Sequence, residues 1–152
     1  EIPGEAEKIV EEIERILDLN AGWDVQTKRV EERDGHIVHV ELHVDNTPTF
    51  DMVASLLQSK KQTHALPSQP TRLIECIQSE PSREEHLWNG QSMDPLNPTV
   101  DLKAGMTTTI QLKSVENGVV SFIGLSHNTI RGAAGGVVLL AELAYLKKYF
   151  EQ

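Results

Sequence analysis

The stretch TTTIQLKSVENGVVSFIGLS, Thr107 to Ser126, decides the fold because it predicts a β-hairpin. Its two halves, Thr107–Ser114 and Val119–Ser126, are rich in the β-branched residues that favour strands. Between them stands Glu116-Asn117-Gly118, and Asn-Gly between two such runs is a strong short-range hairpin signal. We therefore expect an antiparallel pair of strands here.

A further strand is predicted upstream, from His36 to Val44, after the chain break at Arg33-Asp34-Gly35. Alternate residues of a strand point to opposite faces. One face carries Val38, Val40, Leu42 and Val44, and the other carries Ile37, His39, Glu41 and His43. His36 opens the apolar row, so we expect this titratable ring to lead the inward-facing side of the strand.

Helices are predicted before, between and after these strands. Residues Glu5–Leu19 space their apolar side chains as one buried helical stripe. Thr47 and Pro48 indicate the cap and first position of a second helix that ends near Lys61. A last helix, within Thr129–Phe150, is apolar enough to lie buried.

Two shorter strands complete the expected elements. Val25–Val30 is a candidate strand, and Leu73–Ile77 is another. The second lies inside a proline-rich stretch, Leu66–Pro98, which is otherwise expected to be irregular. A long loop of this kind more often wraps a partner or covers a site than hangs free.

Length and composition narrow the class of protein. The chain has 152 residues, which predicts one domain over residues 1–152. A net charge of -9 argues against nucleic acid or an anionic membrane as partner, and no apolar run reaches the length of a membrane span. A single cysteine, Cys76, excludes an internal disulfide and favours a reducing, cytoplasmic setting. The start Glu-Ile-Pro-Gly indicates a processed or excised piece.

Several residues are candidates for chemistry. Arg29 and His36 flank the predicted bend, where a guanidinium can hold a carboxylate and an imidazole can transfer protons. A surface arginine and a satisfied histidine are the alternative. The alternating residues His39, Glu41 and His43 can supply metal ligands, although a solvated strand face is the simpler interpretation.

Two other features favour structural roles. Cys76 stands in a strand-like run with no helix start or glycine turn to activate its thiol, so it is interpreted as structural. The glycine- and alanine-rich segment Gly132–Gly136 lacks the spacing of a dinucleotide-binding loop and is better explained by close helix packing.

Several segments, in order along nearly the whole chain, together resemble the C-terminal part of the catalytic domain of the aspartate-semialdehyde dehydrogenase family. They are GEAEKIVEEIERIL, RVEERDGH, LPSQP, the Gly-Met pair within Lys103–Met106, and SHNTIRGAAGG. The resemblance implies an α+β fold, a mixed or antiparallel sheet packed by helices, similar to the C-terminal domain of glyceraldehyde-3-phosphate dehydrogenase. It also implies a homodimer formed through the sheet and helices of this domain.

The resemblance further implies roles for individual residues. In the family's arrangement Glu5 meets the amino group of the substrate, Lys8 its phosphate and Arg29 its carboxylate. His36 is the general acid/base beside a thiol nucleophile, and Asn128 contacts the nicotinamide of NADP. The chain departs from the family at Glu31-Glu32, where the family usually has proline and valine; two added acids oppose an anionic substrate unless they face solvent.

The implied activity is that of an oxidoreductase of lysine, threonine and methionine biosynthesis. The full enzyme makes L-aspartate 4-semialdehyde from L-4-aspartyl phosphate by NADPH-dependent reductive dephosphorylation. We expect this chain to be a fragment or truncated relative that is inactive alone, because Cys76 does not match the nucleophile's position. One alternative is an acyl-CoA reductase domain like that of malonyl-CoA reductase. Another is a non-catalytic dimerisation or regulatory module.

Overall fold

The computed structural model describes residues 3–18, 21–60, 63–89 and 102–149 of the chain. These residues form two compact units, Glu1–Arg33 and Asp34–Gln152. The first unit contains helix α1, Glu5–Leu17, which confirms the helix predicted at the start of the sequence. Residues 25–30, predicted as a strand, have no regular secondary structure. This prediction was wrong because β-branched residues form a strand only where a neighbouring strand can accept their hydrogen bonds.

The predicted hairpin is the centre of the second unit. Strands β3 (Thr108–Glu116) and β4 (Val119–Ser126) pair antiparallel. The turn residues Asn117 and Gly118 both have positive φ, 52° and 77°, as a type I′ turn requires. A bulge between Leu112 and Ser114 shifts the register of the pair. The Asn-Gly signal in the sequence therefore predicted both the strands and the turn that joins them.

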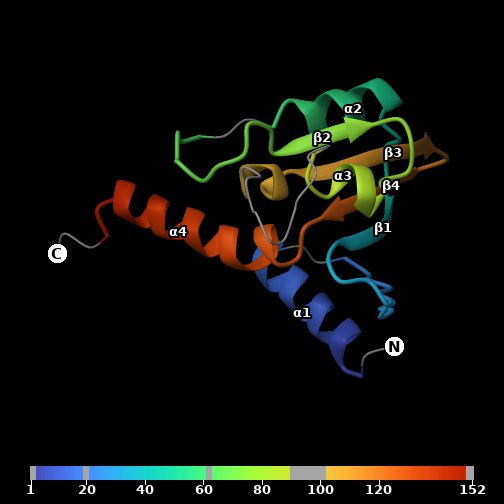
Figure 1. The fold of residues 1–152 in the computed structure, drawn as a ribbon. Helices are drawn as coiled ribbons and strands as arrows, with labels where there is room; N and C mark the ends of the chain where they lie inside the picture. Colours follow the sequence, from blue (N-terminus) through green and yellow to red (C-terminus); the bar gives the residue numbers. More distant parts are fainter. Residues whose placement is uncertain (1–2, 19–20, 61–62, 90–101, 150–152) are drawn as a thin grey trace. The chain divides into compact units, whose positions relative to one another are not determined.

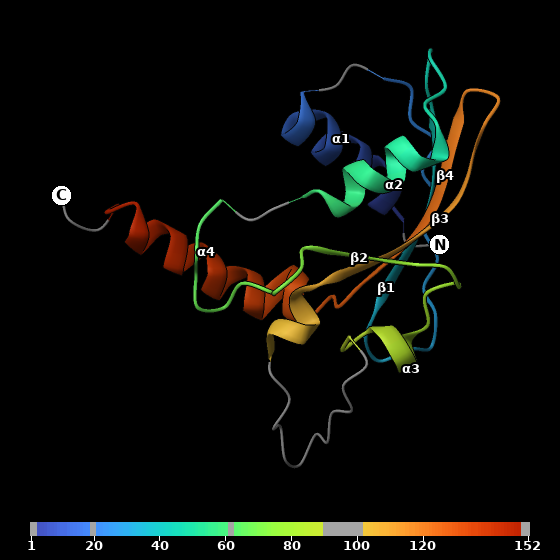
Figure 2. The same ribbon diagram turned by 90° about the horizontal axis from the view of Figure 1, so that it is seen from above.

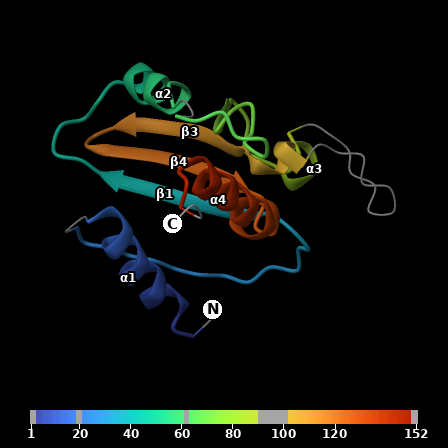
Figure 3. The same cartoon turned by 90° about the vertical axis from the view of Figure 1, so that its left-hand side faces the viewer.

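Two more strands extend this hairpin to a four-stranded sheet with the order β1-β4-β3-β2 (Figures 1 and 3). Strand β1 (His36–His43) pairs antiparallel with β4, and β2 (Ile74–Ile77) pairs parallel with β3. Helix α2 (Phe50–Gln58) contacts β2 and β3. The short helix α3 (Arg83–His86) and the 3-10 turn η1 (Leu102–Met106) follow β2 in the chain. The arrangement confirms the predicted α+β class.

The exit from β1 is joined to the hairpin turn by two hydrogen bonds. Val44 N–H donates to the carbonyl of Gly118 over 2.8 Å, and Gly118 N–H donates to Thr47 Oγ1 over 2.8 Å. Thr47 is therefore not the helix cap that the sequence predicted. Thr49 caps α2 instead, since its hydroxyl accepts from Met52 N–H, and the helix begins at Phe50.

The core lies along the two central strands and the segments that cover them. Its buried apolar residues are Leu87, Ala104, Met106, Ile110, Val120, Ile123 and Leu125. The even-numbered row of β1 is not part of this core, because Val38 and Leu42 remain 42% and 41% exposed and His36 is exposed. The prediction that His36 leads a buried row was therefore wrong for this unit. Strand β1 is an edge strand, and such strands are only partly covered.

The C-terminal helix also differs from the prediction. A π-helical turn, η2 (Ile130–Ala134), leads into α4 (Gly135–Leu146), which projects away from the sheet (Figures 1 and 2). No residue of α4 is buried, and Val137 and Leu140 are 66% and 65% exposed. The helix is apolar on every side, but the unit contacts it near its start through η1 and farther along through Ser68, which donates to Glu142. Composition indicated a need for burial and could not indicate what would cover the helix.

No helix among the described residues is long and apolar enough to cross a membrane.

A matched pair of leucines tests the location of the core. Leu125 is 1% exposed on the central strand β4, whereas Leu140 is on the exposed side of α4. We expect Leu125→Ala to lower the free energy of unfolding of this chain by about 2–5 kcal/mol, because it removes packed methyl groups and leaves a cavity. Leu140→Ala is expected to change it by less than about 0.5 kcal/mol. Urea denaturation of the two variants measures both values, and equal losses would contradict the assignment of the core.

Candidate functional site

His36 is the first residue of β1, where the edge strand begins. Its Cα lies opposite that of Ser126, the last residue of β4. The imidazole is exposed, so it is accessible to a ligand from solvent. The sequence pattern placed His36 correctly at a strand start.

Asn128 meets the residue that precedes His36. The backbone N–H of Gly35 donates to Asn128 Oδ1 over 2.8 Å, although 93 residues separate the two in the chain. The structure therefore brings together two residues singled out from the sequence, His36 and Asn128, at one end of the sheet. Because the Oδ1 atom is already used, the amide NH₂ of Asn128 is the group that remains for a ligand.

Arg83 binds the other side of Gly35. Its Nε–H donates to the Gly35 carbonyl oxygen over 3.2 Å, from the first residue of α3. Gly35 has φ +98°, a left-handed value that favours glycine. Sequence reasoning missed Arg83, since nothing in the pattern Ser82-Arg83-Glu84-Glu85 distinguishes it from an exposed arginine on a helix.

A second histidine lies buried next to this group. His127 is 2% exposed and packs edge-on against the ring of Trp88, with ring centroids 4.4 Å apart. Its Nδ1 lies 3.1 Å from Thr129 Oγ1, and that hydroxyl donates to Asp34 Oδ1 over 3.1 Å. Since the hydroxyl proton goes to Asp34, Thr129 Oγ1 accepts from His127 Nδ1–H. The Nε2 atom of His127 has no hydrogen-bond partner among the described residues.

Burial controls the charge of His127. Removal from water lowers the pKa of its imidazole below the ordinary histidine value, and the nearby Asp34 carboxylate opposes this shift. The sequence pattern did not indicate that His127 is buried, because His127 continues the strand pattern of β4 by a single residue. A neutral, hydrogen-bonded ring in this position supports the segment that carries Asn128.

The other predicted site residues belong to the first unit, Glu1–Arg33. Glu5 is the first residue of α1 and is partly exposed. Lys8 is exposed and forms an ion pair with Glu12 over 3.5 Å. Arg29 is exposed in an irregular segment, and so are Glu31 and Glu32, which places the two added acids in solvent, where their charges are screened.

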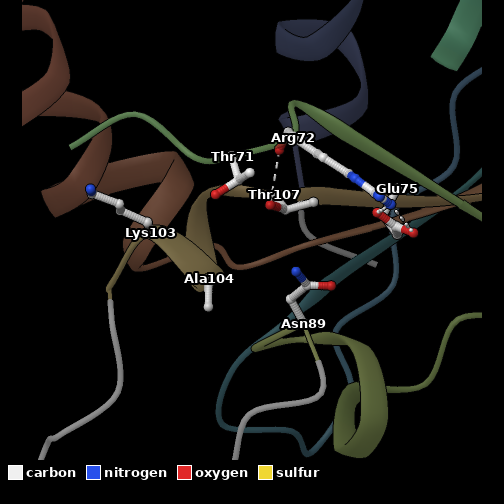
Figure 4. A pocket seen from close by; sticks show the side chains of 7 residues that line it. All are labelled: Thr71, Arg72, Glu75, Asn89, Lys103, Ala104 and Thr107. Atoms are coloured by element: carbon white, nitrogen blue, oxygen red, sulfur yellow. Dashed lines mark hydrogen bonds and ion pairs between the residues drawn. The ribbon is translucent and has the colours of Figure 1, made fainter. Parts of the chain in front are cut away.

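A separate cavity of about 340 Å³ is lined by residues of β2, of η1 and of the loops next to them (Figure 4). These residues are Thr71, Arg72, Glu75, Asn89, Lys103, Ala104 and Thr107. Within it Arg72 and Glu75 point toward each other and form a bidentate pair of 2.9 and 2.7 Å, and Thr107 Oγ1 donates to the Arg72 carbonyl. The guanidinium of Arg72 thus already has a carboxylate partner, that of Glu75, within the chain. No residue predicted from the sequence as a site residue lines this cavity, so it does not serve the candidate site.

Among the described residues no group of three His, Cys, Asp or Glu side chains is placed to hold a metal ion, so His39, Glu41 and His43 form no such cluster. Burial, and to a lesser extent Glu75, raises the pKa of the Cys76 thiol, which disfavours the reactive thiolate. The packing interpretation of Gly132–Gly136 holds for Gly135, where an added Cβ would meet Met106 Sδ at 2.5 Å.

Comparison with known proteins gives relatives for nearly the whole chain. Aspartate-semialdehyde dehydrogenase from Trichophyton rubrum is 32% identical over 170 residues, covering 97% of this chain and 43% of that protein. Aspartate-semialdehyde dehydrogenase from Archaeoglobus fulgidus is 29% identical, with 97% and 42% covered. Malonyl CoA reductase (NADP) from Metallosphaera sedula is 29% identical, with 85% and 35% covered. No family model matches. The chain spans less than half the length of these curated relatives.

The buried His127 predicts how stability depends on pH. Because the folded state lowers its pKa, the unfolded chain binds the proton more readily, and stability falls as the pH drops below the unfolded value of about 6.5. One such proton gives a slope of at most about 1.4 kcal/mol per pH unit. Urea denaturation of His127→Gln at several pH values is expected to show a smaller slope. The exposed His43→Gln is the control, and an equal slope in all three proteins would contradict the assignment.

Proposed function

We propose, because the chain is homologous to aspartate-semialdehyde dehydrogenases, that it forms the substrate-side part of such an enzyme. The single observation that carries the proposal is the identity of about 30% over 97% of the chain. The reaction is the NADPH-dependent conversion of L-4-aspartyl phosphate to L-aspartate 4-semialdehyde, with release of phosphate, in the biosynthesis of lysine, threonine and methionine.

The proposed roles follow from the chemistry of each side chain. Arg29 binds the substrate carboxylate through two parallel N–H donors. Glu5 binds the substrate ammonium group, and the ammonium of Lys8 binds the phosphate. All three residues lie at the surface of the first unit or partly exposed there, so a substrate can displace water and the weak Lys8–Glu12 pair to reach them.

His36 is proposed as the general acid/base. It takes the proton of a nucleophilic thiol and later returns a proton during breakdown of the thioester stage. This role requires an accessible ring on a fixed backbone. The exposed position of His36 and the bonds at Gly35 both support it. Cys76 is not the thiol, since its pKa is raised and it lies within strand β2.

Asn128 is proposed to bind the cofactor. The reduced cofactor NADPH, when bound, would supply the hydride that reduces the acyl group. The fit rests on the free half of the Asn128 amide: its oxygen is held by Gly35 N–H, so the NH₂ group is oriented and available to donate to a carboxamide oxygen of the nicotinamide. We do not expect the 152 residues alone to bind NADP tightly, because Gly132–Gly136 lacks the spacing of a dinucleotide-binding loop. We also do not expect them to catalyse the reaction, because Cys76, their only cysteine, is not the thiol proposed above.

A second candidate function is reduction of an acyl-CoA thioester. It is favoured by the similarity to malonyl CoA reductase (NADP) over 85% of this chain. The same arginine and histidine would serve, with Arg29 on the free carboxylate of the acyl group. Parallel assays of the intact protein with L-4-aspartyl phosphate and with malonyl-CoA, each with NADPH, distinguish the two candidates.

Mutation of the proposed residues tests the site. In the intact protein we expect His36→Gln to lower kcat about 10²–10⁴-fold, since general acid/base catalysis contributes that much. Arg29→Met is expected to raise KM for the substrate about 10-fold or more through loss of a charge-assisted hydrogen-bond pair. The controls are His39→Gln and Arg72→Met. Steady-state kinetics gives both constants, and a His36→Gln enzyme with normal kcat would exclude the proposed role.

Homodimer formation is also proposed, through the exposed apolar row of β1. Val38 and Leu42 form an exposed apolar surface on the edge strand β1, and burial of that surface against a second copy is favourable. Analytical ultracentrifugation of the chain is expected to show a dimer, and Leu42→Lys is expected to shift it toward monomer. His43→Lys, the next residue on the opposite face, should leave the dimer intact. A monomeric parent chain at all concentrations would refute this proposal.

A further inference from the structure

We propose that Arg83 is a positioning residue for His36: it fixes the peptide from which the histidine side chain departs. The catalytic meaning of this assignment rests on the proposed function, whereas the positioning itself rests on contacts within the unit Asp34–Gln152. Arg83 does not touch the reacting atoms in this proposal. It acts through the Gly35 carbonyl, to which its Nε–H donates over 3.2 Å.

Both peptide groups of Gly35 are held. Asn128 Oδ1 accepts the Gly35 N–H on one side, and Arg83 binds the Gly35 carbonyl on the other. That carbonyl belongs to the same planar peptide as the backbone nitrogen of His36. Fixing its plane therefore fixes the direction in which the chain enters β1. The Cα of His36 is held from the opposite side by the pairing with Ser126.

The side chain of Arg83 also limits which residue can stand at position 35. A Cβ added to Gly35 would lie 3.0 Å from Arg83 Cγ and 3.1 Å from Nε, and the φ of +98° disfavours any side chain. The arginine stem thus lies directly on the Cα of Gly35. Glycine is favoured by the backbone conformation, and the close approach of Arg83 leaves little room for a side chain at this position unless the arginine shifts.

Arg83 is itself rigidly presented, although α3 is a single turn. Ser82 caps the turn by accepting Glu85 N–H on its hydroxyl over 3.2 Å, and Ser82 N–H donates to His86 Nδ1 over 3.0 Å. The next residues enter the core, since Leu87 is buried and Trp88 packs on His127. A short helix that is anchored at both ends holds its first residue, Arg83, in a fixed place. A positioning role requires such a fixed side chain.

The functional argument is one of geometry. Strand β1 is an edge strand, and its first residue has a strand partner on one side only. Ends of such strands open more readily than central strands. A catalytic imidazole must stay within a fraction of an ångström of its productive position, because a displacement of about 1 Å can cost roughly 10²-fold in rate. Because β1 has a strand partner on one side only, the hydrogen bonds of Arg83 and Asn128 to Gly35 supply a second restraint on the start of the strand.

The test uses Arg83→Met, which keeps an apolar stem over Gly35 and removes the Nε–H donor. Arg72→Met is the matched control, because the guanidinium of Arg72 bonds to Glu75 and not to Gly35. In the 152-residue chain, amide hydrogen exchange is measured by NMR at Gly35 and at Ile123, a core residue. We expect exchange at Gly35 to become about tenfold faster in Arg83→Met, relative to Ile123, and to be unchanged in Arg72→Met.

The second measurement uses the intact protein with L-4-aspartyl phosphate and NADPH. Arg83→Met is expected to lower kcat about tenfold while KM changes less than about twofold, because substrate binding is untouched. An inactive parent protein with the expected exchange result would refute the proposed function and leave the positioning role standing. Unchanged exchange at Gly35, or equal acceleration at Gly35 and Ile123, would overturn the positioning role, because Arg83 would then be inert or generally structural.

Discussion

The fold of the second unit depends on the turn at Asn117-Gly118. Both residues adopt positive φ, which sets the twist that lets β3 and β4 pair. The same turn receives β1, since Gly118 accepts from Val44 and donates to Thr47. One two-residue turn therefore fixes the hairpin and the far end of the strand that begins with His36. At the opposite end of β1, Asn128 and Arg83 fix Gly35. The candidate catalytic histidine stands on a strand that is anchored at both ends.

The sequence predicted the local elements of secondary structure well, but it predicted poorly which of their faces are buried. The hairpin, α1 and β1 follow from short-range turn chemistry and periodicity, and the structure has them. The cap of α2 was misplaced by two residues because Thr47 and Thr49 are both suitable caps, and only the distant Gly118 decides that Thr47 is used elsewhere. The exposure of α4 and of the β1 row could not be predicted either, since burial depends on which element lies opposite. Of the candidate site, His36 and Asn128 were singled out through the family likeness, but their connection through Gly35 and the parts played by Arg83 and His127 required coordinates.

The group around Gly35 combines neutral and charged contacts. His127 is neutralised by burial and bonded through Thr129 to Asp34, and the charge of Arg83 is applied to a backbone carbonyl. These contacts hold the backbone on both sides of Gly35. A firmly held backbone at this corner of the sheet is compatible with the proposed acid/base role of His36.

The separation of 93 residues between Gly35 and Asn128 has a consequence for biogenesis. During synthesis β1 leaves the ribosome long before β4, its strand partner, exists. The hairpin of β3 and β4 closes through local contacts as soon as it emerges, and β1 joins it only afterwards by closing a long loop. For that interval the nascent chain carries Val38, Val40 and Leu42 on an unpaired strand. This is the period in which a chaperone has the most to bind, and it ends with the bond that positions His36.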